Sequence, residues 1–143
     1  MKKLIFLSLF LPFVAKAQFK IVNTATINIL ELRAGTWPIT LQRVTKESDT
    51  TYVLLFRDQQ YTDDVIMTTY RFKDIEQFKY FQKGLSALKN GSNGDVAKFK
   101  DYTIKRVDIK KEGVWYVLSC AEGGITNFQQ AEANKMIAAI VNL

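Results

Sequence analysis

The spacing of apolar residues changes at residue 74, and this change limits the folds open to the chain. Before it, residues 51–57 are strongly apolar and residues 65–72 alternate with a period of two, which is typical of strands. After it, apolar residues recur at spacings of three and four, which predicts an amphipathic helix. The members of this stripe are Ile75, Phe78, Phe81, Leu85 and Leu88. The chain must therefore combine strands with helices.

Further strands are predicted on both sides of this helix. Residues 38–46 form the strand before residues 51–57, and residues 26–32 fit either a strand or a short helix. Residues 102–110 and 114–120 flank a short Gly-containing connection and predict a hairpin. Its second strand is apolar on both faces, so we expect it in the middle of a sheet.

Capping signals set the ends of two helices. Asp74 with Gln77 forms a capping box at the start of the first helix, and Asn90-Gly91 ends it. Thr126 with Gln129 forms a second capping box and predicts a final helix from that point. The order β-β-β-β-α-β-β-α follows. It predicts an α+β fold, a two-layer sandwich with a mainly antiparallel sheet of five or six strands and two helices on one face.

The N-terminus has the three parts of a secretory signal peptide. Lys2 and Lys3 precede an apolar run at residues 4–14, and Ala15-Lys16-Ala17 fits the small-x-small pattern of signal peptidase. The apolar run is shorter than the roughly 20 residues of a membrane span. We therefore predict cleavage after Ala17, a secreted or periplasmic protein, no stable membrane anchor after cleavage, and a single domain over residues 18–143.

Composition excludes several kinds of chemistry. The chain has no His, the usual general base and the commonest metal ligand, and Cys120 is its only Cys. Serine or cysteine hydrolysis with a His base, zinc sites of the usual type and an internal disulfide are therefore excluded. We expect Cys120 to be buried in its strand and predict no cofactor. Without residues 1–17 the chain carries 17 basic and 14 acidic residues, a bias too weak to predict a nucleic-acid partner.

Two groups of residues are candidates for binding. Aromatic residues accompanied by Lys or Arg are common in binding surfaces. A possible surface of this kind comprises Trp37, Tyr61, Lys110, Lys111 and Trp115. The competing interpretation is that Trp115 packs in the core. The second group is a possible anion site at a strand-to-helix junction, and it comprises Gly123, Gly124 and Thr126. A tight turn explains the same glycines.

The acidic residues form no recognisable catalytic or metal motif. Asp58, Asp63 and Asp64 do not have the spacing of a calcium loop. Glu31, Glu112 and Glu122 lie near strand ends, but nothing in the sequence places two of them across a cleft. No catalytic residue is therefore predicted.

These observations favour an exported, non-enzymatic domain that binds a protein or a component of the cell envelope. A His-independent enzyme that uses carboxylates and a structural envelope subunit are the alternatives. The sequence specifies neither the ligand nor the oligomeric state.

Overall fold

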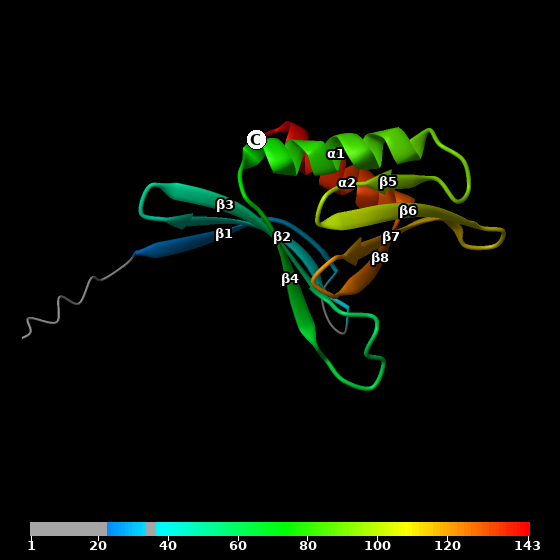
Figure 1. Cartoon of the computed structure of the whole chain (residues 1–143), viewed down its shortest axis with the longest axis horizontal. Helices are drawn as coiled ribbons and strands as arrows, with labels where there is room; N and C mark the ends of the chain where they lie inside the picture. Colours follow the sequence, from blue (N-terminus) through cyan, green and yellow to red (C-terminus); the bar gives the residue numbers. More distant parts are fainter. Residues whose placement is uncertain (1–22, 34–36) are drawn as a thin grey trace, which may run out of the picture.

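The computed structural model describes residues 23–33 and 37–143. The predicted signal peptide and its cleavage site lie outside these residues. Figure 1 shows two sheets lying side by side, with both helices above them. The first half of the chain forms strands β1 (Thr24–Arg33), β2 (Ile39–Lys46), β3 (Asp49–Arg57) and β4 (Met67–Phe72), followed by helix α1 (Ile75–Lys89).

The second half repeats this order of elements. It forms strands β5 (Val96–Lys98), β6 (Tyr102–Ile109), β7 (Gly113–Cys120) and β8 (Ile125–Gln129), followed by helix α2 (Gln130–Val141). Each set of four strands is an antiparallel meander with neighbours in sequence order, β1-β2-β3-β4 and β5-β6-β7-β8. The molecule therefore consists of two β4α units.

The α+β class, the antiparallel pairing and the two helices are as predicted, but the single sheet of five or six strands is wrong. The described residues form two four-stranded sheets. Two strands were missed. β5 has only three residues, too few to show a period, and β8 occupies the segment expected to begin the last helix. The 26–32 segment is a strand, and β7 lies inside its sheet as expected.

The last helix begins later than its first capping signal. In β8, Thr126 and Phe128 are buried while Ile125 and Asn127 on the other face are half-buried, which is the period of a strand. The chain turns into α2 at Gln129, whose backbone N–H donates to Glu132 at 2.8 Å. A second capping pattern, three residues after the first, is thus the one that the fold uses.

One hydrophobic core joins the two units. Helix α1 packs on β3 and β4 of the first sheet and on β5 and β6 of the second, while α2 packs on β1, β7 and β8. Aromatic rings dominate the core between them. Phe72 of β4 lies 4.9 Å from Phe78 and 5.3 Å from Phe81 of α1, measured between ring centroids. All three rings are fully buried.

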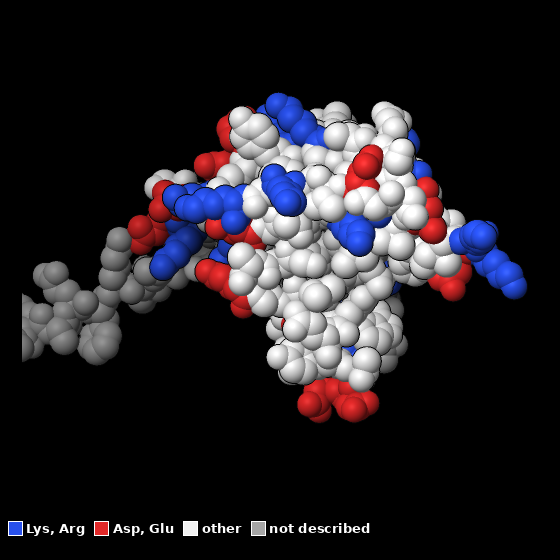
Figure 2. All heavy atoms as spheres, turned by 45° about the vertical axis from the view of Figure 1, so that its right-hand side comes forward, with Lys and Arg blue, Asp and Glu red and all other residues white. Residues whose placement is uncertain are grey.

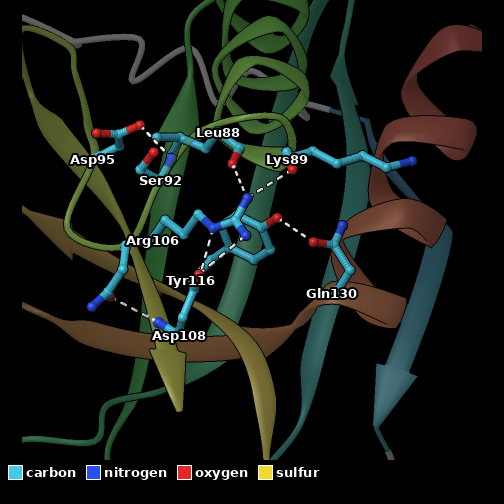
Figure 3. Close-up of polar contacts among 9 residues, drawn as sticks. Leu88, Lys89, Ser92, Asp95, Arg106, Asp108, Tyr116 and Gln130 are labelled. Carbon is cyan, nitrogen blue, oxygen red and sulfur yellow. Dashed lines mark hydrogen bonds and ion pairs between the residues drawn. The ribbon is translucent and has the colours of Figure 1, made fainter. Parts of the chain in front are cut away.

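The C-terminal end of α1 is held by a side chain of the second sheet. Arg106 of β6 points at the last turn of the helix (Figure 3), where its Nη1 donates to the carbonyl oxygens of Leu88 and Lys89 at 3.0 and 2.7 Å. Asp108 accepts from Nε of the same guanidinium at 2.8 Å. The positive group satisfies carbonyls that the helix leaves free and opposes the negative end of its dipole.

The first turn of α2 is tied to both sheets. The Tyr116 hydroxyl on β7 donates to Gln130 Oε1 at 2.6 Å. Arg33 at the end of β1 forms an ion pair with Glu132. These contacts fix the two sheets relative to the helix layer. Among the described residues, no helix has the length and apolar character needed to cross a membrane.

Candidate functional site

The two sheets meet where the β7–β8 turn docks against β4. Strand β4 is an edge strand, paired only with β3. Gly124 in the turn has φ of +97°, and a Cβ built on it would lie 2.7 Å from Cγ2 of Thr68 and 3.3 Å from Cζ of Phe56. Only glycine allows both this backbone conformation and this close approach. The close approach of Gly124 therefore sets the spacing between β4 and the turn.

A concave site of about 310 Å³ opens directly beside this contact. Strand β4 forms one wall, and the start of β6 and the β7–β8 turn form the other. We call it the inter-sheet hollow. It is lined by Thr69, Tyr70, Arg71, Asp101, Cys120, Glu122 and Gly123.

Tyr70 is the aromatic residue that lines the inter-sheet hollow, and it belongs to a cluster of packed rings. Tyr70 lies 4.8 Å from Tyr102 in an edge-to-face arrangement, and Tyr102 stacks on Phe99 at 4.3 Å between centroids. A second concavity of about 270 Å³ on the α1 side shares Tyr70 and Asp101 with the first. Tyr70 and Asp101 therefore face two adjoining sites.

The phenol and the thiol in the hollow both stay protonated at neutral pH. Burial, then the nearby charges of Asp101 and Glu122, raise the pKa of Tyr70 to about 12. Burial, with Asp58 and Glu122 nearby, raises the pKa of Cys120 to about 11. A nucleophilic cysteine needs the opposite shift, toward the thiolate. Cys120 and Tyr70 thus present neutral hydrogen-bonding groups.

Two carboxylates and one guanidinium carry the charge of the inter-sheet hollow. Neither the Asp101 nor the Glu122 carboxylate forms a hydrogen bond or an ion pair with another described residue, and Arg71 forms no ion pair there either. Elsewhere in the described chain, Glu132 and Asp108 each pair with an arginine. The acids of the hollow are available to a ligand.

An exposed apolar segment covers the connection between β3 and β4 and the first residue of β4, the strand that forms one wall of the hollow. It includes four of the ten large apolar side chains that are exposed in the described part of the chain. They are Tyr61, Val65, Ile66 and Met67, with exposed fractions of 48, 67, 38 and 41 %. We call these four residues the hairpin tip. The connection projects away from the helices at the bottom of Figure 1, and Figure 2 shows a largely uncharged surface there with acidic side chains at its extremity.

The hairpin tip is held by buried polar groups. Asp58, only 3 % exposed, accepts at Oδ1 from the backbone N–H groups of Gln60 and Ile125, each at 3.0 Å. Arg57 donates to the carbonyl oxygens of Thr62 and Asp64 at 3.1 and 3.3 Å. These contacts fix the base of the connection to β3 and to β8 of the other sheet. The exposed apolar residues therefore lie on a loop whose base is held by hydrogen bonds.

The structure places the predicted aromatic and basic residues in two regions. Trp37 is half-buried, with the Arg57 guanidinium 3.9 Å from its ring, and it lines a shallow hollow with Thr62, the neighbour of Tyr61. Lys110 and Lys111 lie in the β6–β7 turn at the right of Figure 1, far from the β3–β4 connection.

Trp115, near the start of β7, lies on the sheet face that turns away from the helices. Its neighbour Tyr116 is fully buried on the helix side, so alternation puts the indole on the opposite side. The side chain is half-buried, and its Nε1–H is buried without a hydrogen-bond acceptor among the described residues. Trp115 is therefore packed, although not beneath a helix.

The three predicted anion-site residues do not surround a helix N-terminus. The helix starts at Gln130, so the premise of a strand-to-helix junction at Thr126 is wrong. Thr126 is buried in β8. The Gly123 N–H donates to the carbonyl of Cys120 at 3.1 Å, and Gly124 packs on β4. The nearby Ile125 N–H donates its hydrogen bond to the Asp58 carboxylate.

Sequence reasoning missed Tyr70 and Asp101 and expected a buried Cys120. The thiol is half-buried and lines the inter-sheet hollow from the end of β7. Glu122 is the one acid considered from the sequence that reaches the hollow. Asp58 is a bracing residue rather than a partner of Asp63 and Asp64, and the described ranges contain no group of three potential metal-ligating side chains.

Comparison with protein-family models gives no match to this chain, and neither does comparison with curated proteins. The fold and the site alone define the class, a pair of β4α units with a ligand-sized hollow at their seam.

Proposed function

We propose that this chain is an exported, non-enzymatic domain that binds a protein or a component of the cell envelope through the hairpin tip and the adjoining inter-sheet hollow. The observation that carries the proposal is the hairpin tip. Large exposed apolar side chains that gather on one short segment are typical of an interaction site. Here they lie on a connection held by Asp58 and Arg57, so a partner need not pay for ordering it.

The hollow supports binding better than catalysis. Its thiol and phenol are shifted away from their reactive forms. The chain has no His to act as a general base near neutral pH. Its volume of about 310 Å³ lies at the small end of ligand sites, which suits one side chain or a small molecule.

Site-specific photo-crosslinking tests the proposal. A benzophenone side chain is introduced at Val65 of the hairpin tip and, as a control, at Val141 of α2, because both valines are 67 % exposed. Irradiation of the exported fraction should give a discrete adduct from position 65 and none from position 141. Val65→Ser should abolish the adduct formed from a probe at Met67, while Val141→Ser should leave it unchanged. Identical patterns from the two positions would contradict a specific site.

Export is tested separately. The N-terminus of the exported protein should be Gln18 or its cyclised form, because Ala15-Lys16-Ala17 is the predicted processing sequence. A mature protein that starts at Met1 would refute the predicted signal peptide and would leave the proposed binding site untouched.

A His-independent carboxylate enzyme is the second candidate, because Asp101 and Glu122 line the same hollow. It predicts turnover of a substrate, for example a nitrophenyl glycoside, that Asp101→Asn and Glu122→Gln both remove. We expect no turnover above the level of these variants.

A further inference from the structure

We propose that the inter-sheet hollow binds an organic cation, an alkylammonium or a guanidinium group, and that a Lys or Arg side chain of the bound partner supplies it. This inference rests on the proposed binding function and names the chemistry that the hollow recognises. Three features of the hollow carry it: its charge, its aromatic wall and its neutral hydrogen-bonding groups.

The charge of the hollow opposes that of the chain. The chain has 20 basic and 14 acidic residues, yet the lining of the hollow has two carboxylates and one guanidinium. The carboxylates of Asp101 and Glu122 are not paired with any cation of the described chain. Carboxylates facing a partly enclosed site favour a positive ligand, and each can accept a charge-assisted hydrogen bond from it.

The aromatic wall selects an organic cation. Tyr70 is half-buried and lines the hollow, and its edge-to-face contact with Tyr102 at 4.8 Å between ring centroids restricts its ring. Ammonium and guanidinium groups are attracted to the face of such a ring. Their apolar stems also gain from contact with aromatic carbon. A hard, hydrated metal ion prefers oxygen ligands to an aromatic ring, and the described chain offers no set of three metal-ligating side chains.

The remaining lining groups add no negative charge of their own. Burial keeps the pKa values of Cys120 and Tyr70 near 11 and 12, so both are neutral at physiological pH. Arg71 is the single opposing charge, and it lies on β4 with its side chain exposed. One arginine against two carboxylates does not favour an anion.

Titration with small probes tests the cation site. We expect n-butylammonium and n-butylguanidinium to cause saturable shifts in the amide NMR signals of Tyr70, Asp101 and Glu122, with Kd of about 1–10 mM, as befits a fragment with a few contacts. The uncharged 1-butanol should cause no saturable shift. The double variant Asp101→Asn, Glu122→Gln should weaken butylammonium binding at least tenfold, while Glu76→Gln on the exposed side of α1 should not. Equal effects of butanol and butylammonium, or unchanged binding by the double variant, would overturn the proposal.

A further comparison identifies the source of the cation. A peptide, acetyl-Ala-Lys-Ala-amide, should bind at least as tightly as butylammonium if a protein side chain is the ligand. A tenfold preference for spermidine over both would assign the site to free polyamines and overturn the assignment to a partner protein.

The crosslink from position 65 distinguishes the two proposals. If butylammonium does not bind but the adduct persists, the cation site is wrong and the binding surface stands. If butylammonium binds but position 65 gives no adduct, the hollow binds an organic cation, and the hairpin tip is not the binding surface.

Discussion

Replacing Gly124 with alanine tests the contact that forms the seam between the two sheets. The added methyl group would lie 2.7 Å from Cγ2 of Thr68 and 3.3 Å from Cζ of Phe56, both on the neighbouring sheet. The backbone φ of +97° is also unfavourable for any residue with a Cβ. The substitution therefore combines backbone strain with overpacking of a buried turn against the neighbouring sheet.

The expected loss follows from these two effects. A positive φ costs a non-glycine residue about 1–2 kcal/mol, and overpacking a buried contact costs about 1–3 kcal/mol. Alanine restricts the unfolded chain, which offsets about 0.4–1 kcal/mol. We expect Gly124→Ala to lower the free energy of unfolding by about 2–4 kcal/mol, measured by urea denaturation followed by tryptophan fluorescence.

Gly123 provides a matched control one residue away. Its φ is +101°, but a Cβ there meets no atom within 4 Å. Gly123→Ala should therefore show backbone strain alone, about 1 kcal/mol. Thr68→Ser removes the methyl group that the introduced alanine side chain would strike, so in the double variant the loss should fall toward that of Gly123→Ala. Equal losses for the two glycines, with no rescue by Thr68→Ser, would refute the docking of this turn on β4.

Three further outcomes follow from the described contacts. The raised pKa of Cys120, about 11 against an ordinary 9.0, makes its native thiolate scarce, so Ellman's reagent at pH 8 should react about 100-fold more slowly with the folded chain than with the urea-unfolded chain. Burial opposes ionisation of Glu132, but hydrogen bonds from Arg33 and the Gln129 N–H outweigh it and lower its pKa. That stabilisation is present above the unfolded pKa of 4.5 and is lost on acidification below it, so Glu132→Gln should flatten the acid limb of stability against pH. Tyr116→Phe removes the 2.6 Å hydrogen bond to Gln130 and should cost about 0.5–1.5 kcal/mol in a urea titration.

Local pattern was enough to predict most elements but not their assembly. The stripe from Ile75 to Leu88 became α1, and the hairpin around Gly113 formed as expected. Each depends on spacing within one segment, which is readable from sequence. Whether β4 pairs with β5 depends instead on the approach of distant edges. The docking of Gly124 on Thr68 settles that geometry, and no spacing rule encodes it.

The start of α2 shows how two valid local signals can compete. Both Thr126-x-x-Gln129 and Gln129-x-x-Glu132 fit a capping pattern, and the first has the better N-cap residue. Burial of Thr126 and Phe128 on one face of β8 outweighs that preference, because a strand there completes the second sheet. The missed strand in turn removed the basis for an anion site at the glycines.

The hollow could not be found from sequence because its parts come from distant segments. Tyr70 is on β4, Asp101 precedes β6 and Glu122 follows β7, and nothing in their spacing connects them. They meet because each unit ends its meander at the seam and each helix crosses to the other sheet. The same arrangement explains why the seam is concave: its core side is filled by Phe72, Phe81 and Tyr102, whereas the rim is bridged at Gly124 by backbone alone. A residue larger than glycine at this bridge would push the walls apart and widen the hollow. Gly124→Ala should therefore weaken butylammonium binding as well as folding, and Thr68→Ser should restore both together.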